Sequence, residues 1–510
     1  MTDWTPVDLL PVLWLVLAGA VLAAALRRWY EPVPGRVLAV FAAVLLALFG
    51  PVLFGGRVLL PPPHGNPAQE DMIRVVAPAQ AAARAALEEG HWPLWNRRAG
   101  AGMPLLADLQ SQALQPLTLL GWPLPLARAA GFVAALRVLA GLAFSFLWLR
   151  RLGMRAGLAL AGSLAYGVGL LPFWAGWTAG NVGAFLPVGL YGLARRDGTG
   201  RGTLLVAVAL VGILLGGDLA ASAGGLGILA IYALTLGLRG LAGLGAALGV
   251  VAAVSAPVLL PAWRYLPQAV APWAGISSQS WRWRLPATPL GVTIPKSDSI
   301  GAVRYGLATH GLKGFRMAAL GDVLPPNLAG LYGLEDARIS GPMAPRDYLE
   351  LVKPLDANGP GDPLYRRLGV RYLLTPLAAE LPSPWVKIFA DSTAAVWEQA
   401  DPFPLLFLAT PRPAGGVLIQ RLEDTWISGP ANLRRRQWLG TSIYQDGGWL
   451  LLIDGYLHHT GHGTFVATRL PAGAMRLDLL YRPAPFVWGC VITALGLVAG
   501  FVLFIPKPAR

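Results

Sequence analysis

The chain of 510 residues is too apolar for a soluble protein. Hydrophobic residues make up 55% of it and charged residues 13%, with a mean hydropathy of +0.53, whereas soluble domains carry about 25% charged residues. The net charge is +14, but many arginines end apolar runs, where they set membrane topology, so we expect no nucleic-acid partner. The single cysteine, Cys490, excludes an intrachain disulfide and a cysteine-based metal site. No Walker loop or dinucleotide fingerprint occurs, so no nucleotide or redox cofactor is expected.

Apolar runs of about 20 residues, long enough to span a bilayer, predict a polytopic α-helical membrane protein with about nine spans. Arg-rich turns follow alternate runs, beginning at Arg27 and Arg28. Because positive loops stay in the cytoplasm, we expect the N-terminus outside and the C-terminus inside a bacterial-type cytoplasmic membrane. The predicted spans are Pro6–Leu26, Arg36–Phe54, Ala130–Leu149, Ala156–Trp177, Asn181–Ala194, Thr203–Gly217, Ala220–Leu238, Leu241–Pro261 and Pro485–Ile505.

The distribution of the apolar runs divides the chain into four segments. A multi-span domain comes first, and a long polar stretch on the outer side separates it from the last span. The predicted segments are a membrane domain at 1–262 with an outer loop at 57–129, a mixed, loop-rich outer region at 263–401, an outer antiparallel β-sandwich at 402–485, and a final span with a basic tail at 486–510.

Local patterns predict individual elements on the outer side. Met72–Glu89 is expected to be a helix that Gly90 ends, and Arg346–Val352 a second helix. Val370–Thr375 is expected to be a strand. In the sandwich, apolar residues alternate with polar ones along 475–481. Asp454-Gly455 after an apolar run predicts a hairpin turn.

The outer loop contains the densest group of carboxylates, arginines and amides near the membrane surface. Glu70 and Asp71 could act as a general base for an acceptor hydroxyl or hold a divalent cation against a phosphate. The plainer interpretation is that they cap the helix that follows. Arg74 lies one turn on, and it could bind phosphate or neutralise Asp71.

Further residues in this loop, and one in a later turn, have two interpretations each. Trp95, Asn96 and Arg97 could bind a sugar ring and a phosphate, or belong to an interfacial aromatic belt. Asp108 and Gln112 could bind substrate hydroxyls or cap a helix lying in the interface. Asp218, between two apolar runs, could support the site or be an ordinary turn residue. We take all six as candidate substrate-binding residues.

An ordered set of short motifs resembles the YfhO-like branch of the GT-C membrane glycosyltransferases. Each motif is degenerate alone, and together they touch most of the chain. They are Asp71 with Arg74 and Pro78, Pro93-Leu-Trp95-Asn96, Gly102-Met-Pro104 with Gln112 and Pro116-Leu117, Gly216-Gly217, Leu324-Pro-Pro-Asn327 with Tyr332, Leu368-Gly-Val-Arg-Tyr372, Gly448-Trp449 with Ile453-Asp454-Gly455, Leu470-Pro471-Ala-Gly473, and Tyr481-Arg-Pro483.

The resemblance implies transfer of a sugar from a polyprenyl-phosphate donor to an envelope glycan, lipid or protein acceptor on the outer face. Asp71 matches the catalytic acid of that family, with Glu70 beside it, and a divalent cation such as Mg²⁺ or Mn²⁺ near the phosphate is implied. Arg74 and Arg97 would be phosphate-binding candidates. A Gly-Gly turn that continues with Asp218 departs from the family, where His or Gln is expected.

Two other classes of function remain open at this point. A non-catalytic membrane scaffold could keep the fold and bind glycan or a partner through the sandwich. A lipid or glycan transporter would need polar residues inside the spans, for which Asp218 and Arg137 are the best candidates, although Arg137 could simply snorkel.

Overall fold

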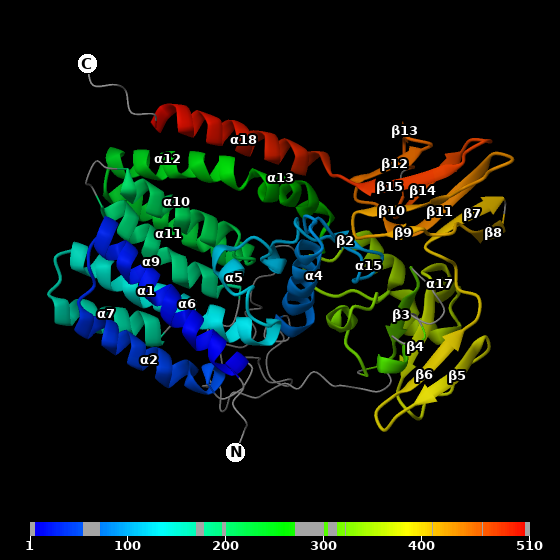
Figure 1. Cartoon of the computed structure of the whole chain (residues 1–510), viewed down its shortest axis with the longest axis horizontal. Coiled ribbons are helices and arrows are strands. Elements are labelled where there is room, and N and C mark those ends of the chain that lie inside the picture. Colours follow the sequence, from blue (N-terminus) through cyan, green and yellow to red (C-terminus); the bar gives the residue numbers. More distant parts are fainter. Residues whose placement is uncertain are drawn as a thin grey trace.

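In the computed structural model, a helical bundle forms one half of the molecule and β-sheets form the other, with helix α4 (Ala77–Glu88) where the two meet (Figure 1). The two halves have separate hydrophobic cores. The structure describes residues 6–54, 72–169, 178–195, 200–270, 300–303, 306, 314–321, 323–410, 412–461 and 463–504.

The bundle is built from apolar helices packed around α6, whose membrane-spanning window is 83% buried. Its mostly apolar surroundings agree with a helix that is hydrophobic on nearly all sides, Arg137 being the buried charged exception. The bundle helices are α1 (Pro6–Trp29), α2 (Gly35–Leu53), α6 (Leu126–Arg151), α7 (Ala156–Gly169), α9 (Gly180–Ala194), α10 (Arg201–Leu214), α11 (Leu219–Thr235), α12 (Leu238–Val254), α13 (Ala256–Tyr265) and α18 (Ala484–Phe504).

The predicted count of nine spans is not confirmed by helix length. Among the described residues, three helices are long and apolar enough to cross a membrane, and a fourth span results if α12 and the helical segment after it, bent by 81°, are taken together. Apart from α18, which has 21 residues, the remaining apolar helices are shorter: α9, for example, has 15 residues, or about 22 Å, against a hydrocarbon core of about 30 Å.

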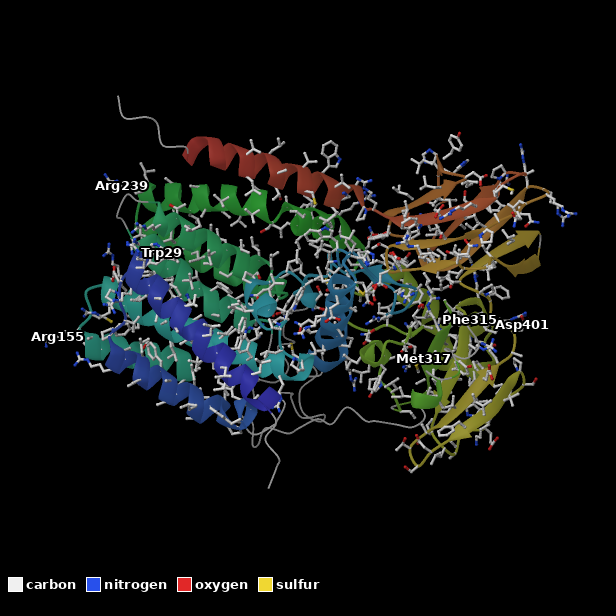
Figure 2. The ribbon with its side chains drawn as sticks, viewed as in Figure 1. Trp29, Arg155, Arg239, Phe315, Met317 and Asp401 are labelled. Carbon is white, nitrogen blue, oxygen red and sulfur yellow. The ribbon has the colours of Figure 1, made fainter. Side chains whose placement is uncertain are left out.

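The basic turns lie together at one end of the bundle, as the sequence predicts. Figure 2 shows Trp29, Arg155 and Arg239 at the end away from the sheets. Arg151 pairs there with Glu31 at 3.1 Å. That this end faces the cytoplasm stays a prediction.

The last helix, α18, lies along α12 and α13 (Figure 1). Small residues allow this close approach: a Cβ built on Gly489 would lie 2.5 Å from Pro257 Cα. Thr493 Oγ1 also donates to the carbonyl of Ala253 at 2.7 Å. The outer sheets are thereby attached to the bundle at both of their chain ends.

The outer region before residue 400 contains a four-stranded sheet that the sequence analysis did not predict as such. Its order is β3-β4-β6-β5, with β3 and β4 parallel and the other pairs antiparallel. The expected strand at Val370–Thr375 is β4, and the expected helix at Arg346–Val352 is α15. The other strands are β3 (Arg316–Ala319), β5 (Trp385–Ala390) and β6 (Ala395–Gln399).

The predicted antiparallel sandwich is confirmed as two sheets. Their orders are β13-β12-β15-β10-β9 and β14-β11-β7-β8. Asp454 and Gly455 both have positive φ, +52° and +85°, as a tight hairpin turn between β12 and β13 requires. The strands are β7 (Leu406–Thr410), β8 (Arg412–Gly416), β9 (Arg421–Leu422), β10 (Trp426–Pro430), β11 (Gln437–Tyr444), β12 (Trp449–Ile453), β13 (Tyr456–His458), β14 (Phe465–Leu470) and β15 (Arg476–Tyr481).

Candidate functional site

The first outer loop forms a compact layer between the bundle and the sheets. The predicted helix at Met72–Glu89 begins as a π-helical turn, Met72–Val76, and continues as α4, after which Gly90 takes a φ of +80°. Two short strands, β1 (Trp95–Asn96) and β2 (Met103–Pro104), then pair with each other. A 3₁₀ turn at Leu109–Ser111 and helix α5 (Pro116–Leu120) lead the chain back into the bundle.

A pocket lies between this loop and the outer region. Its empty space of about 320 Å³ includes open solvent, so it is a partly open pocket and not a closed cavity. Its polar side chains come from both segments: Asp108 and Asn96 from the loop, Asn327 and Ser340 from the outer region. The other lining residues are Val75, Pro78, Ala79, Ala99, Met103, Gly341, Met343 and Ala344.

Asp108 is the titratable group in the pocket wall. Its side chain is 2% exposed, and one carboxylate oxygen accepts from the backbone N–H of Gln110 at 3.0 Å, which caps the 3₁₀ turn. Burial, only partly opposed by that hydrogen bond, raises the pKa of Asp108 to about 7. A carboxyl that titrates near neutral pH can bind a hydroxyl in either protonation state.

Asn327 attaches the outer region to the start of the loop helix. Its φ of +70° aims the amide so that Nδ2 donates to the carbonyl of Arg74 at 2.9 Å and to that of Ser340 at 2.8 Å. Its Oδ1 accepts from the Ser340 N–H at 3.3 Å. The π-helical turn that follows Asp71 in the chain is therefore fixed to the opposite wall of the pocket.

Trp95 joins the loop to the sandwich instead of lying open for a sugar ring. Its side chain is 2% exposed. The ring packs against Trp449 and Tyr481, with centroids 5.2 Å and 4.5 Å away. Aromatic pairs in this geometry contribute about 0.5–1.5 kcal/mol each beyond their burial.

The turn between β1 and β2 requires glycine under the Trp95 ring, and this gives a testable prediction. Gly102 has a φ of +91°, and a Cβ at this position would lie 2.5 Å from Trp95 Nε1. Gly102→Ala is therefore expected to lower the free energy of unfolding by about 2–3 kcal/mol, from backbone strain and overpacking together. Thermal unfolding in detergent would measure the loss. Gly90 also has a positive φ, but a Cβ there would have no neighbouring atom within 4 Å. If Gly90→Ala lowered the free energy of unfolding as much as Gly102→Ala, the packing argument would be contradicted.

Arg97 is held by two carboxylates, one from the outer region and one from the sandwich. Its Nε lies 3.0 Å from Asp424 Oδ1, and its Nη1 lies 3.5 Å from Glu335 Oε1. Burial lowers the pKa of Arg97, but these two carboxylates outweigh it and hold that pKa above the ordinary value. The neighbouring Asn96 accepts from the N–H of Arg98 at 3.0 Å. A phosphate at Arg97 would have to compete with both acids.

Gln112 belongs to a buried hydrogen-bond network between the loop and the bundle. Its Oε1 accepts from Arg137 Nη2 at 3.0 Å and from Asn181 Nδ2 at 3.1 Å. Asn181 also accepts from Arg137 Nε at 2.9 Å and donates to the carbonyl of Gly216 at 2.9 Å. Arg137 is 3% exposed, so it does not snorkel to the surface. Gln112 thus has a positioning role.

Asp218 is the N-cap of α11. Its Oδ1 accepts from the N–H of Ala221 at 2.8 Å, which is the ordinary role of an acid at this position. The preceding Gly217 packs on the loop, because a Cβ there would meet the carbonyl of Leu109 at 2.9 Å. The Gly-Gly turn therefore packs directly against the backbone of the loop.

Glu70 and Asp71, the two predicted catalytic acids, lie outside the described residues. The predicted metal site at Asp71 therefore stays a prediction. Within the described part of the chain, no group of three or more His, Cys, Asp or Glu could hold a metal ion. Asp108 is the carboxylate among the described residues that line the pocket. These side chains do not make a cation site by themselves, so we derive no step through a metal.

Of the predicted binding residues, the structure brings Asn96 and Asp108 together at the pocket and places the backbone of Arg74 beside it. Trp95, Arg97, Gln112 and Asp218 lie elsewhere, each in contact with other parts of the protein. The sequence analysis did not identify Ser340 as part of a site. Asn327 belongs to the Leu324-Pro-Pro-Asn327 motif, and its Pro-Pro-Asn sequence is a turn signal that could have marked it.

Comparisons with known proteins establish no family for the chain. No family model and no curated protein matches it, so the YfhO-like resemblance stays a prediction. Among solved structures, the chain is similar to the arabinofuranosyltransferase AftD from Mycobacteria, a mutant solved by cryo-electron microscopy, with 12% identity and a TM-score of 0.48. The match covers 88% of this chain and 60% of that protein, so the chain spans about three fifths of its length.

Proposed function

We propose that the chain is a membrane glycosyltransferase of GT-C type that moves a sugar from a polyprenyl-phosphate donor to an envelope glycan, lipid or protein acceptor on the outer face. The observation that carries the proposal is the pocket with the buried carboxyl of Asp108, at the sheet-facing end of an apolar bundle. A lipid-linked donor must be met at such an end, because its polyprenyl tail stays in the bilayer.

The residues divide the work as follows. Asp71, with Glu70 beside it, accepts the proton of the acceptor hydroxyl as the oxygen attacks the sugar carbon and the bond to phosphate breaks. Asp108 and Asn96 bind acceptor hydroxyls in the pocket. Arg74 is the candidate for the phosphate that leaves, whose negative charge needs a positive partner. Asp71 would also hold a divalent cation such as Mg²⁺ or Mn²⁺ near that phosphate.

The basic end of the bundle is assigned to the cytoplasm by the positive-inside rule. The N-terminus and the pocket are then outside and the C-terminus inside. This arrangement gives the site access to envelope acceptors. It also explains why a chain with net charge +14 keeps so many arginines at one end of its spans.

The deciding experiment compares the wild type with Asp71→Asn and Asp108→Asn. Purified protein is incubated with a panel of polyprenyl-phosphate sugars and an envelope extract, with and without Mg²⁺ or Mn²⁺, and release of polyprenyl phosphate is measured. We expect release by the wild type, loss of turnover in Asp71→Asn, and a raised acceptor KM in Asp108→Asn. Asp401→Asn, on the exposed side of the outer region, is the matched control and should behave as wild type.

A non-catalytic scaffold or glycan-binding protein is the second candidate. The observation that favours it is that Trp95, Arg97, Gln112 and Asp218 all serve contacts within the protein. Folded wild type that releases no polyprenyl phosphate from any donor would support this candidate. Equal release by the wild type and Asp71→Asn would keep the transferase and remove Asp71 from its mechanism.

A further inference from the structure

The sandwich carries an exposed group of arginines around a tryptophan, which we call the Arg-Trp patch: Arg434, Arg435, Arg436, Trp438 and Arg469. The three consecutive arginines are all exposed, in the turn that leads into β11. Trp438 is 48% exposed and lies directly opposite Arg469 of β14 in the ladder. The Arg469 guanidinium stacks over the indole at 4.9 Å from the ring centre.

The positive charge of the patch is not neutralised within the described part of the chain. There, Arg434, Arg435, Arg436 and Arg469 form no ion pair with a carboxylate. Two carboxylates of the other sheet, one in β15 and one in the turn between β12 and β13, are already engaged. Asp478 pairs with Arg476 at 2.9 Å, and Asp454 accepts from the N–H groups of Met475 and Arg476 at 3.0 Å and 2.8 Å.

The patch lies at the end of the sandwich away from the bundle and the pocket. The opposite end of β11 reaches the first outer loop, where Tyr444 N–H donates to the carbonyl of Ala101 at 2.9 Å. Trp438 is six residues earlier in the same strand, or about 20 Å away. A bilayer in contact with the bundle therefore does not explain why these apolar and basic side chains are exposed.

We propose that the Arg-Trp patch binds an anionic polysaccharide. Guanidinium groups form paired hydrogen bonds with carboxylate or phosphate groups, and the half-exposed ring of Trp438 offers an apolar surface for a sugar ring. Four arginines beside one exposed ring fit a polymer that carries charge at repeated sugar units. The patch is separate from the pocket, so the proposal does not depend on the transferase activity.

The test uses the full chain in nanodiscs of zwitterionic lipid, so that lipid charge does not contribute. Polygalacturonate serves as the anionic probe and dextran as the neutral one, and binding is measured by calorimetry at two salt concentrations. We expect the wild type to bind polygalacturonate and not dextran, more weakly at high salt. The triple variant Arg434→Gln, Arg435→Gln, Arg436→Gln should lose at least about tenfold in affinity, and Trp438→Ala about fivefold or more.

The control variant replaces Arg150, Arg151 and Arg155 by glutamine at the other end of the molecule and should leave binding unchanged. Because all the substituted side chains are on the surface, unfolding temperature checks that each variant is folded. Equal affinity of the wild type and the triple variant would overturn the proposal. So would equal binding of dextran, or equal or tighter binding of polyglutamate or single-stranded RNA, since these would show a neutral-sugar site or a surface that recognises charge without sugar.

Discussion

Replacing Asn181 by leucine is expected to lower the free energy of unfolding by about 3 kcal/mol. Asn181 is fully buried, and its amide connects Arg137 of α6, Gln112 of the outer loop and the carbonyl of Gly216. Leucine has nearly the same volume but no polar atom. It would leave a buried guanidinium N–H and a buried carbonyl without these partners, and each such loss is costly in an apolar interior.

A double-mutant cycle separates this network from general packing. Arg137→Met removes the guanidinium that Asn181→Leu would leave without its hydrogen-bond partner. The loss of unfolding free energy caused by Asn181→Leu should therefore be smaller by at least about 1 kcal/mol in the Arg137→Met background than in the wild type. Ser163→Ala, which removes a partly buried hydrogen bond within one helix turn, is the matched control and should cost little. Unfolding by detergent titration measures each variant. Equal costs of Asn181→Leu in both backgrounds would show that the network adds no stability.

Where the local pattern and the tertiary environment agree, the sequence was sufficient to predict the element and its bounds. The strand at Val370–Thr375 and the helix at Arg346–Val352 have the predicted bounds. The turn at Asp454-Gly455 has the predicted conformation. Each of these depends on neighbours within a few residues, such as turn chemistry or the alternation of one buried face.

The four-stranded sheet β3-β4-β6-β5 could not be predicted from such local patterns. All four residues of β3 are buried, so it shows no alternation, and its neighbour β4 begins about 50 residues later in the chain. Its first residue is Arg316, 1% exposed, which donates to the carbonyl of Leu368 and to Ser442 at 2.8 Å and 2.7 Å. A buried arginine whose partners are 52 and 126 residues away cannot be recognised from its neighbours in the sequence.

The contacts of the side chains in the candidate site could not be predicted from the sequence. The polar composition of the first outer loop suggested a site there, and in the structure this loop packs against the outer region. Yet Arg97 is held by Glu335 and Asp424, and Trp95 by Trp449 and Tyr481. These partners come from segments more than 200 residues later in the chain. The aromatic and basic residues that suit substrate recognition therefore form contacts between parts of the protein instead.

The second large effect is a pH dependence of stability that originates at Asp108. Its pKa is raised by burial from 3.8 to about 7 in the folded protein. Between these values the folded state binds more protons than the unfolded state, so stability is greatest at low pH and falls as pH rises through the folded pKa. The fall amounts to about 1.4 kcal/mol per pH unit within this window, or about 3 kcal/mol between pH 5 and pH 8.

Asp108→Asn tests the origin of this slope, because asparagine can keep the hydrogen bond to Gln110 and cannot titrate. We expect the difference in stability between about pH 5 and pH 8 to shrink by about 3 kcal/mol relative to the wild type. Burial also raises the pKa of Asp424 and of Asp446, and these contribute equally to both proteins. Asp218→Asn keeps Asp108 in place and should keep the wild-type slope. An unchanged slope in Asp108→Asn would show that the carboxyl is already ionised in the folded protein, and a pocket that keeps a charge would bind the acceptor through a carboxylate at every pH in this range.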